Sequence, residues 1–193
     1  MSSFELDNTN FISRRDFLKI AGLSFVGFYS PQLITKFNVM KENQGRVIYP
    51  TVTLYESPSL SSRKIKQYWK DLVLQITEIT VGDLDPTHNR IWYQIADEGY
   101  AHSGGIQPVK TQLNEPSFEI PENGTLAEVT VPYTDAFWGP GQQNKFAYRF
   151  YYETTHWVTK TVQDSNGDPW YLVLDDKWEY EFFVPSSHLR IIP

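Results

Sequence analysis

A six-residue pattern occurs twice in this chain and strongly limits how the chain can fold. Trp92–Asp97 reads Trp-Tyr-Gln-Ile-Ala-Asp, and Trp170–Asp175, 78 residues later, reads Trp-Tyr-Leu-Val-Leu-Asp. Each copy runs on to a short polar-then-apolar ending, Ile106–Val109 after the first and His188–Pro193 after the second. A pattern that recurs together with its surroundings indicates two copies of one structural unit. A chain of 193 residues has room for two such small units.

Short runs of β-branched and aromatic residues, separated by turn residues, fill the chain after residue 44. Such runs predict β-strands, and their even spacing predicts small barrels or a sandwich. One pair of runs, on either side of Asp164–Asp168, predicts a β-hairpin. No segment of this region has the 3.6-residue apolar period of a surface helix. The expected strands are Arg46–Leu54, Leu72–Val81, Ile91–Ala96, Leu126–Val131, Phe146–Tyr152, His156–Gln163, Trp170–Leu174 and Tyr180–Val184.

The repeat places two β units at residues 45–110 and 125–193. Residues 111–124 between them are rich in Pro, Asn and Glu and predict a linker. Residues 1–44 carry 5 basic and 4 acidic side chains, whereas residues 45–193 carry 12 basic and 19 acidic ones. An acidic body lacks the clustered Lys and Arg that neutralise phosphates, so no nucleic acid is expected as a partner.

The first unit resembles the bacterial SH3-like domains. Val52–Ile65 reads Val-Thr-Leu-Tyr-Glu-Ser-Pro-Ser-Leu-Ser-Ser-Arg-Lys-Ile. The family has a strand there that leads into a loop of the form Ser-Gly-Pro-Ser-x-x-Ser-x-x-Ile. The later Trp-Tyr-x-Ile at Trp92–Ile95 and Gly-Tyr-Ala-His at Gly99–His102 are similar to the same family. The resemblance implies an all-β fold of two small SH3-like barrels in tandem, after an N-terminal signal helix.

The N-terminal region resembles a twin-arginine export signal. Ser13–Lys19 reads Ser-Arg-Arg-Asp-Phe-Leu-Lys, which matches every fixed position of the pattern Ser/Thr-Arg-Arg-x-Phe-Leu-Lys, and a weakly hydrophobic run follows. The resemblance implies recognition by the twin-arginine translocation machinery and export across the cytoplasmic membrane to the cell envelope. The alternative is a surface amphipathic helix that starts at Ser13. The residues expected to carry the signal are Ser13, Arg14, Arg15, Phe17, Leu18 and Lys19.

The sequence after this signal does not indicate whether the signal is cleaved from the mature protein. No small-x-small motif of the Ala-x-Ala type follows the apolar run. The run is also shorter than the ~20 residues that a membrane span needs. An uncleaved signal would remain on the protein as a membrane anchor.

The composition excludes several kinds of active site. The sequence contains no cysteine, which excludes a thiol nucleophile and a cysteine-bound metal among these residues. It also has no Gly-x-Ser-x-Gly elbow and no phosphate-binding glycine loop. Asp175, Asp176 and Lys177 predict a solvated hairpin tip, and Glu179 and Glu181 are expected to alternate outward from Tyr180 and Phe182, so no acid/base pair is expected here. The histidines lack the spacing of metal ligands, so no cofactor and no metal are expected. These histidines, expected as polar surface or turn residues, are His88, His102, His156 and His188.

Aromatic residues are denser in the second unit than one small core can bury. They gather in Phe137–Trp138, Phe146–Tyr152 and His156–Trp157. A Tyr or Trp ring offers an apolar face with a polar handle, which suits sugar rings or an extended peptide. The alternative is that these rings pack between the two units or against a further domain. The residues expected to form a binding surface are Trp138, Tyr148, Tyr151, Tyr152 and Trp157.

An export signal of this type followed by two SH3-like units resembles the N-terminal, non-catalytic region of bacterial L,D-transpeptidases. Those enzymes cross-link peptidoglycan through a cysteine in a Ser-x-Gly-Cys-type motif, and this sequence contains no such motif. The resemblance therefore implies an exported, non-catalytic cell-envelope module that binds peptidoglycan or docks a cell-wall enzyme. The alternative is a truncated or split N-terminal part of such an enzyme, whose catalytic domain lies outside this sequence.

Overall fold

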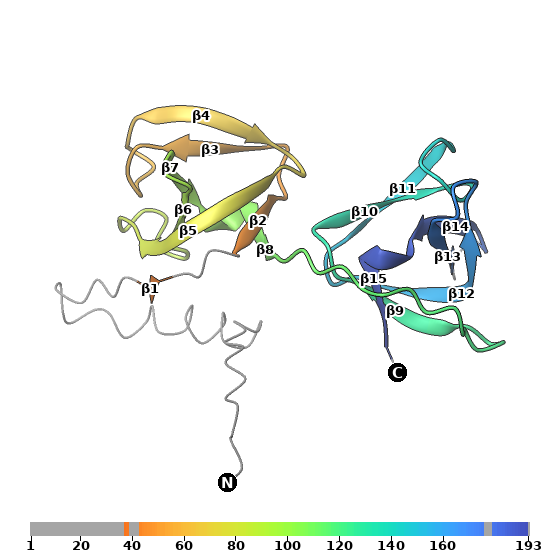
Figure 1. The fold of residues 1–193 in the computed structure, drawn as a ribbon. Helices are drawn as coiled ribbons and strands as arrows, with labels where there is room; N and C mark the ends of the chain where they lie inside the picture. The colour runs from red at the N-terminus through yellow and green to blue at the C-terminus, as the bar shows by residue number, and fades with distance from the viewer. Residues whose placement is uncertain (1–36, 39–42, 176–178, 193) are drawn as a thin grey trace, which may run out of the picture.

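The computed structural model describes residues 37–38, 43–175 and 179–192, and these residues form an all-β protein. Two small antiparallel barrels lie side by side (Figure 1), which confirms the expected fold class. Within the described residues the only helices are the 3₁₀ turns η2 (Ser103–Gly105) and η3 (Ser186–His188), and no helix there is long enough to span a membrane. The expected export signal and signal helix lie outside the described residues.

The first barrel is a curled sheet with the strand order β4-β3-β7-β6-β5-β2-β8, and β1 pairs with β5 beside this path. The long strand β5 pairs with β2 near its start and with β6 further along, so the sheet bends around it. The edge strands β4 and β8 do not pair with each other, which leaves the barrel partly open. Its strands are β1 (Phe37–Asn38), β2 (Gln44–Val47), β3 (Thr51–Tyr55), β4 (Lys64–Trp69), β5 (Val73–Val81), β6 (Ile91–Ile95), β7 (Gly99–His102) and β8 (Ile106–Val109).

The second barrel repeats this arrangement strand for strand, in the order β11-β10-β14-β13-β12-β9-β15. Its long strand β12 takes the place of β5, because it pairs with β9 near its start and with β13 further along. Its strands are β9 (Thr125–Val129), β10 (Tyr133–Phe137), β11 (Phe146–Tyr151), β12 (Thr155–Gln163), β13 (Pro169–Leu174), β14 (Glu181–Pro185) and β15 (Leu189–Ile191).

The turn before each long strand shows the repeat at the level of single residues. Asp71 before β5 and Glu153 before β12 both have a positive φ, of 67° and 61°. Their backbone amides donate to the carbonyl oxygens of Val47 and Val129, respectively. A positive φ is uncommon outside glycine, so its presence at both positions marks matching backbones.

Each barrel has its own core, and the repeated Trp-Tyr pair is buried in both. Trp92 and Tyr93 on β6 are 0% and 1% exposed, and Trp170 and Tyr171 on β13 are 4% and 0% exposed. Two separate core clusters, one in each barrel, include Tyr93 and Tyr171, whereas the tryptophans are buried outside these clusters because neighbouring residues of a strand point to opposite faces. Burial of two large rings supplies apolar area that a barrel of this size needs. The repeat found in the sequence is therefore a repeat of buried positions.

The segment between the barrels, residues 110–124, contains no strand and runs along the second barrel (Figure 1). The Ser117 amide donates to the Tyr171 hydroxyl at 2.7 Å, and Thr161 Oγ1 donates to the Ser117 carbonyl at 2.5 Å. The segment is therefore bonded to the second barrel as well as linking the two. The division into units 45–110 and 125–193 with a linker at 111–124 stays a proposal.

Strand boundaries differ from the expectation at several places. The expected strand Arg46–Leu54 is two strands, β2 and β3, separated by a bend at Tyr49 and Pro50. Proline has no amide hydrogen with which to continue a ladder. The strands that were not among the expected ones are β1, β4, β7, β8, β10 and β15. The expected hairpin around Asp164–Asp168 is confirmed, since β12 pairs with β13 across that loop.

Candidate functional site

Six side chains form a continuous cluster on the second barrel, which we call the aromatic cluster. They come from strands β11, β12 and β14, from the residue after β10, and from the residue before Glu181 at the start of β14. Neighbouring rings touch from one side of the group to the other. The members are Trp138, Tyr148, Phe150, His156, Tyr180 and Phe182.

Phe182 lies at the centre of the aromatic cluster. Its ring centroid is 5.1 Å from that of Trp138 and 6.4 Å from those of Phe150 and Tyr180. Trp138 and Tyr180 also meet, at 5.8 Å, and Tyr148 extends the group from Phe150 at 5.7 Å. Edge-to-face and tilted contacts at these distances are favourable for aromatic rings. The rings therefore hold one another in a defined arrangement.

The cluster has a buried base and an exposed outer layer. Phe150 and Phe182 are 6% and 8% exposed, whereas Trp138, Tyr148 and Tyr180 are 48%, 58% and 52% exposed. Among the described residues, none hydrogen-bonds with the indole N–H of Trp138 or with the hydroxyls of the two exposed tyrosines. The outer layer thus offers a ligand both flat apolar faces and polar groups. Contiguous exposed rings of this kind make this surface a candidate for contact with a partner.

His156 adds a further flat ring to the cluster from strand β12. It stacks on Phe150, with the ring centroids 3.8 Å apart and the planes at 25°. Burial lowers the pKa of His156 to about 4, and the charge of Asp175 opposes this only in part. The imidazole is therefore neutral at pH 7, and the cluster gains no positive charge from it.

In the first barrel, two positions that match members of the aromatic cluster take part in an ion pair and a hydrogen bond to the same glutamate. Lys66 and Tyr68 on β4 correspond to Tyr148 and Phe150 on β11, because both strands pair in the same register with the strand before them. Glu98 accepts a hydrogen bond from the Tyr68 hydroxyl and forms an ion pair with Lys66. The Lys66 ammonium lies 4.8 Å from the centroid of the Tyr68 ring. An ion pair thus stands in the first barrel where the second has an aromatic platform.

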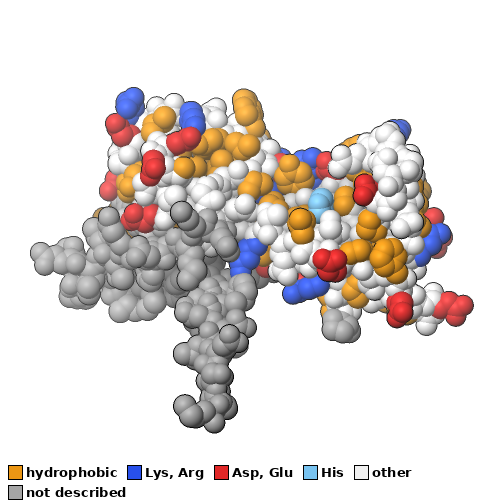
Figure 2. Space-filling view, viewed as in Figure 1, with side chains coloured by type: hydrophobic (Ala, Val, Ile, Leu, Met, Phe, Trp, Pro, Cys, Tyr) orange, Lys and Arg blue, Asp and Glu red, His pale blue; other side chains and the backbone are white. Residues whose placement is uncertain are grey.

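Exposed apolar side chains nevertheless occur on both barrels (Figure 2). Trp69 at the end of β4 is 69% exposed, more than Trp138 in the aromatic cluster. Within the described part of the chain, Trp69 has no ring contact with another aromatic side chain. The difference between the barrels therefore lies in how the rings are grouped and not in exposure alone.

The structure separates the residues that the sequence placed in one binding surface. Trp138 and Tyr148 belong to the aromatic cluster. Trp157 follows His156 on β12, and neighbouring residues of a strand point to opposite faces. Its Nε1 donates to the Asn123 carbonyl at 3.0 Å. Trp157 therefore lies away from the cluster, against the connecting segment.

The other two expected residues lie near the end of β11. The guanidinium carbon of Arg46, from the first barrel, lies 4.2 Å from the centroid of the Tyr151 ring. Tyr152 is half-buried in the turn after β11, where its amide donates to the Pro132 carbonyl. Tyr151 thus matches the alternative that some of these rings pack between the two units.

Four members of the cluster were not expected in the site: Phe150, His156, Tyr180 and Phe182. Alternation along β11 places Phe150 on the same face as Tyr148, and this pattern could have predicted Phe150 as a member of the site. Tyr180 and Phe182 were expected on the face of their strand opposite Glu179 and Glu181, and this alternation alone did not indicate that they join an aromatic cluster. His156, expected as a polar surface or turn residue, lies within β12, where it is half-buried and its ring stacks on the buried ring of Phe150.

Two threonine–histidine pairs have the spacing of a nucleophile and its base but lack the required arrangement. Thr154 Oγ1 is 2.8 Å from His156 Nε2, yet that hydroxyl donates to the Tyr151 carbonyl at 2.7 Å. Thr134 Oγ1 is 2.8 Å from His188 Nδ1, but Thr134 is 1% exposed and a substrate has no access to it. Neither pair provides an activated nucleophile. In the described ranges no group of three His, Cys, Asp or Glu side chains could hold a metal ion.

Comparison with known proteins gives distant likeness only. No family model and no curated protein matches the chain. Among solved structures, NlpC1 of Trichomonas vaginalis has 11% sequence identity and a TM-score of 0.27, over 85% of this chain and 51% of that one. NlpC2 of the same organism has 10% identity and a TM-score of 0.27, over 80% and 49%. The CBD of endolysin LysPBC5 has 15% identity and a TM-score of 0.27, over 78% and 93%. This chain spans about half the length of the two Trichomonas proteins. Likeness at this level establishes neither a family nor a function.

Proposed function

We propose that this protein is a non-catalytic module of the cell envelope that binds peptidoglycan through the aromatic cluster of its second barrel. The observation that carries the proposal is the grouping of half-exposed rings, Trp138, Tyr148 and Tyr180, over a buried aromatic base. Peptidoglycan presents sugar rings with apolar faces and hydroxyl rims, joined to short peptides. Flat rings with polar handles match both parts.

The charge at the site agrees with an uncharged ligand surface. His156 is neutral at pH 7 because burial lowers its pKa to about 4. The exposed members of the cluster are uncharged tryptophan and tyrosine side chains. A neutral aromatic platform recognises shape and hydroxyl pattern more than charge, and this favours a glycan strand as the part that lies on the rings.

The cellular location in this proposal rests on the sequence. The match of Ser13–Lys19 to the twin-arginine pattern supports export through that machinery to the envelope. The sequence contains no cysteine, so the thiol chemistry of L,D-transpeptidases is not available to these 193 residues. Docking of a cell-wall enzyme on the same rings would use the same surface with a protein partner.

Co-sedimentation with purified peptidoglycan sacculi tests the proposal. The full chain is expected in the pellet, and Trp138→Ala is expected to move most of it to the supernatant. The matched control is Trp69→Ala, which removes a more exposed tryptophan from the first barrel. Wild-type protein that stays in the supernatant would overturn peptidoglycan binding. Equal losses in the two variants would overturn the assignment to the aromatic cluster.

A further inference from the structure

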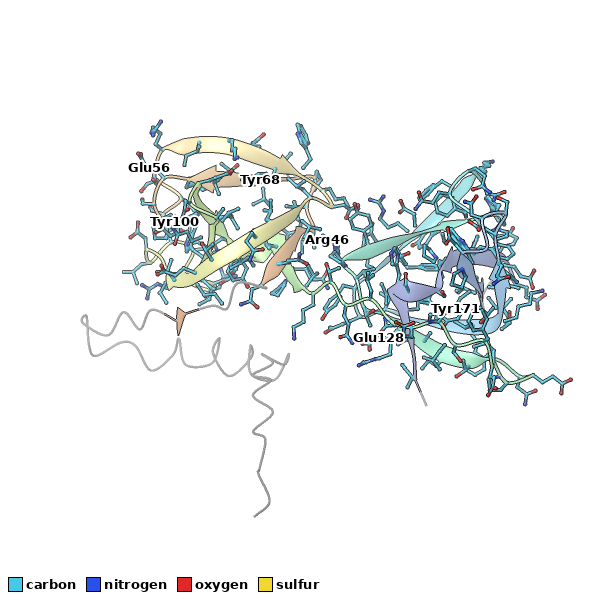
Figure 3. The ribbon with its side chains drawn as sticks, in the orientation of Figure 1. Arg46, Glu56, Tyr68, Tyr100, Glu128 and Tyr171 are labelled. Atoms are coloured by element: carbon cyan, nitrogen blue, oxygen red, sulfur yellow. The ribbon has the colours of Figure 1, made fainter. Side chains whose placement is uncertain are left out.

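The two barrels meet at a joint built from one aspartate and two arginines. Each carboxylate oxygen of Asp71 accepts a hydrogen bond, one from Arg46 of the first barrel at 2.7 Å and one from Arg149 of the second at 2.9 Å. Arg46 lies on the side of the first barrel that faces the second (Figure 3). A single carboxylate thus connects strand β2 of one barrel with strand β11 of the other.

Further bonds fix both arginines in place. Arg149 makes a two-pronged contact with Asp135 on the neighbouring strand, through Nε at 2.6 Å and Nη2 at 3.0 Å. Arg46 donates from its second terminal nitrogen to Gln107 at 2.6 Å. A planar guanidinium held at several points has little freedom to turn away from Asp71.

Aromatic rings support the same two arginines. The guanidinium carbon of Arg46 lies 4.2 Å from the centroid of Tyr151, so this contact also crosses between the barrels. The guanidinium carbon of Arg149 lies 4.1 Å from the centroid of Tyr133. Both distances are within the range of favourable cation–π contacts.

These contacts are more buried than an ordinary surface ion pair. The side chains of Arg46, Asp71 and Arg149 are 7%, 15% and 28% exposed. In the ion pair between Arg63 and Glu56 of the first barrel, the side chains are 72% and 57% exposed. Partly buried pairs are screened less by salt, and a buried charge that loses its partner is costly.

We infer that Asp71 locks the two barrels into one rigid body, so that the aromatic cluster keeps a fixed orientation relative to the first barrel. Domains connected by a short segment move against each other unless their interface holds them. Here the shared carboxylate and the crossing Arg46–Tyr151 contact provide that hold. The inference concerns the joint alone and does not depend on which ligand the aromatic cluster binds.

Distance measurement between spin labels tests this lock. The sequence has no cysteine, so Lys64→Cys and Ser165→Cys introduce one label on each barrel at exposed positions. The test variant is Asp71→Asn. Asparagine tolerates the positive φ of this residue, which keeps the turn, but its amide nitrogen is a donor and would face the N–H donors of one of the two arginines. The matched control is Glu56→Gln, which breaks the exposed ion pair.

The doubly labelled protein is expected to give one narrow distance peak, and Glu56→Gln is expected to keep it. Asp71→Asn is expected to lose the narrow peak and give a broad distribution. Should Asp71→Asn lose its amide dispersion in NMR spectra, Arg149→Lys decides, because lysine lacks the planar fork with which Arg149 holds Asp135 through Nε and Nη2 while Nη1 reaches Asp71. A broad distribution in the unmodified background, or a narrow peak in a folded Asp71→Asn or Arg149→Lys variant, would overturn the lock.

Discussion

The two barrels have the same backbone and different surfaces. Strand order, the left-handed turn residues and the buried Trp-Tyr pair repeat from one barrel to the other. At one edge of that common backbone the first barrel has the Lys66–Glu98 ion pair, and the second has stacked and edge-packed rings. The difference indicates that the core and turn positions determine the fold. The open edge beside β4 or β11 can therefore differ between the barrels without changing that fold.

The largest effect on stability is expected at the buried tryptophan that both barrels have at matching positions. Trp92→Ala and Trp170→Ala each remove a large buried ring and should destabilise their own barrel by about 3–5 kcal/mol. Calorimetry should show one barrel unfolding early while the other unfolds near its original temperature. Equal loss of both barrels in both variants would contradict independent unfolding of the two barrels.

A smaller effect is expected at one position of β2 and β9, where the first barrel has glycine and the second has alanine. Gly45 on β2 corresponds to Ala127 on β9, as both pair with the long strand of their barrel. A Cβ at Gly45 would lie 2.4 Å from Ile106 Cγ2 and 2.9 Å from Ile76 Cδ1. Gly45→Ala should therefore cost about 2 kcal/mol by overpacking. Ala127→Gly should cost about 1 kcal/mol, and urea denaturation of both variants measures the difference.

Acid should weaken the second barrel through His156. Its pKa falls to about 4 in the folded state because of burial, against about 6.5 in an unfolded chain. The stability that the second barrel gains from keeping His156 neutral is therefore fully present above about pH 6.5. It is lost as the pH falls towards 4, because the unfolded chain binds the proton first. Across that window, wild type should lose about 1.5 kcal/mol relative to His156→Gln, a figure reduced for partial exposure. Parallel stability curves for the two proteins would show that His156 titrates normally.

The smallest effect is expected at the paired core tyrosines. The Tyr171 hydroxyl accepts from the Ser117 amide, whereas the buried Tyr93 hydroxyl has no hydrogen-bond partner among the described residues. Tyr171→Phe should cost about 1 kcal/mol because it leaves that amide unbonded, and Tyr93→Phe should cost nothing or stabilise. Thermal melts of the two variants test this, and a larger loss for Tyr93→Phe would reverse the comparison.

Much of the fold could be predicted from the sequence, because alternating β-branched and aromatic runs carry a direct signal. The Trp92 and Trp170 copies and the Asp164–Asp168 hairpin were found in this way. Strand β4 was missed, since Lys64, Lys66 and the other residues before Tyr68 are exposed and show no apolar alternation. The break between β2 and β3 depends on a local bend at Pro50 that hydrophobic patterning does not reveal.

The candidate site could be predicted only in part. Aromatic density pointed to Trp138 and Tyr148, but their separation from Trp157 depends on which strand face each occupies. Tyr151 is of a residue type that is common in ligand-binding surfaces, but it contacts Arg46 across the joint instead. Such contacts join residues far apart in the chain, and their partners cannot be inferred from local sequence.

The most direct test of the aromatic cluster as the binding surface is NMR of the tryptophan indole N–H signals during titration with soluble peptidoglycan fragments. The Trp138 signal is expected to shift, with that of Trp69 unchanged, because the cluster is present on the second barrel and an ion pair stands at its place on the first. Trp69 that shifts while Trp138 stays unchanged would place the ligand on the other barrel. That result would contradict the proposed site.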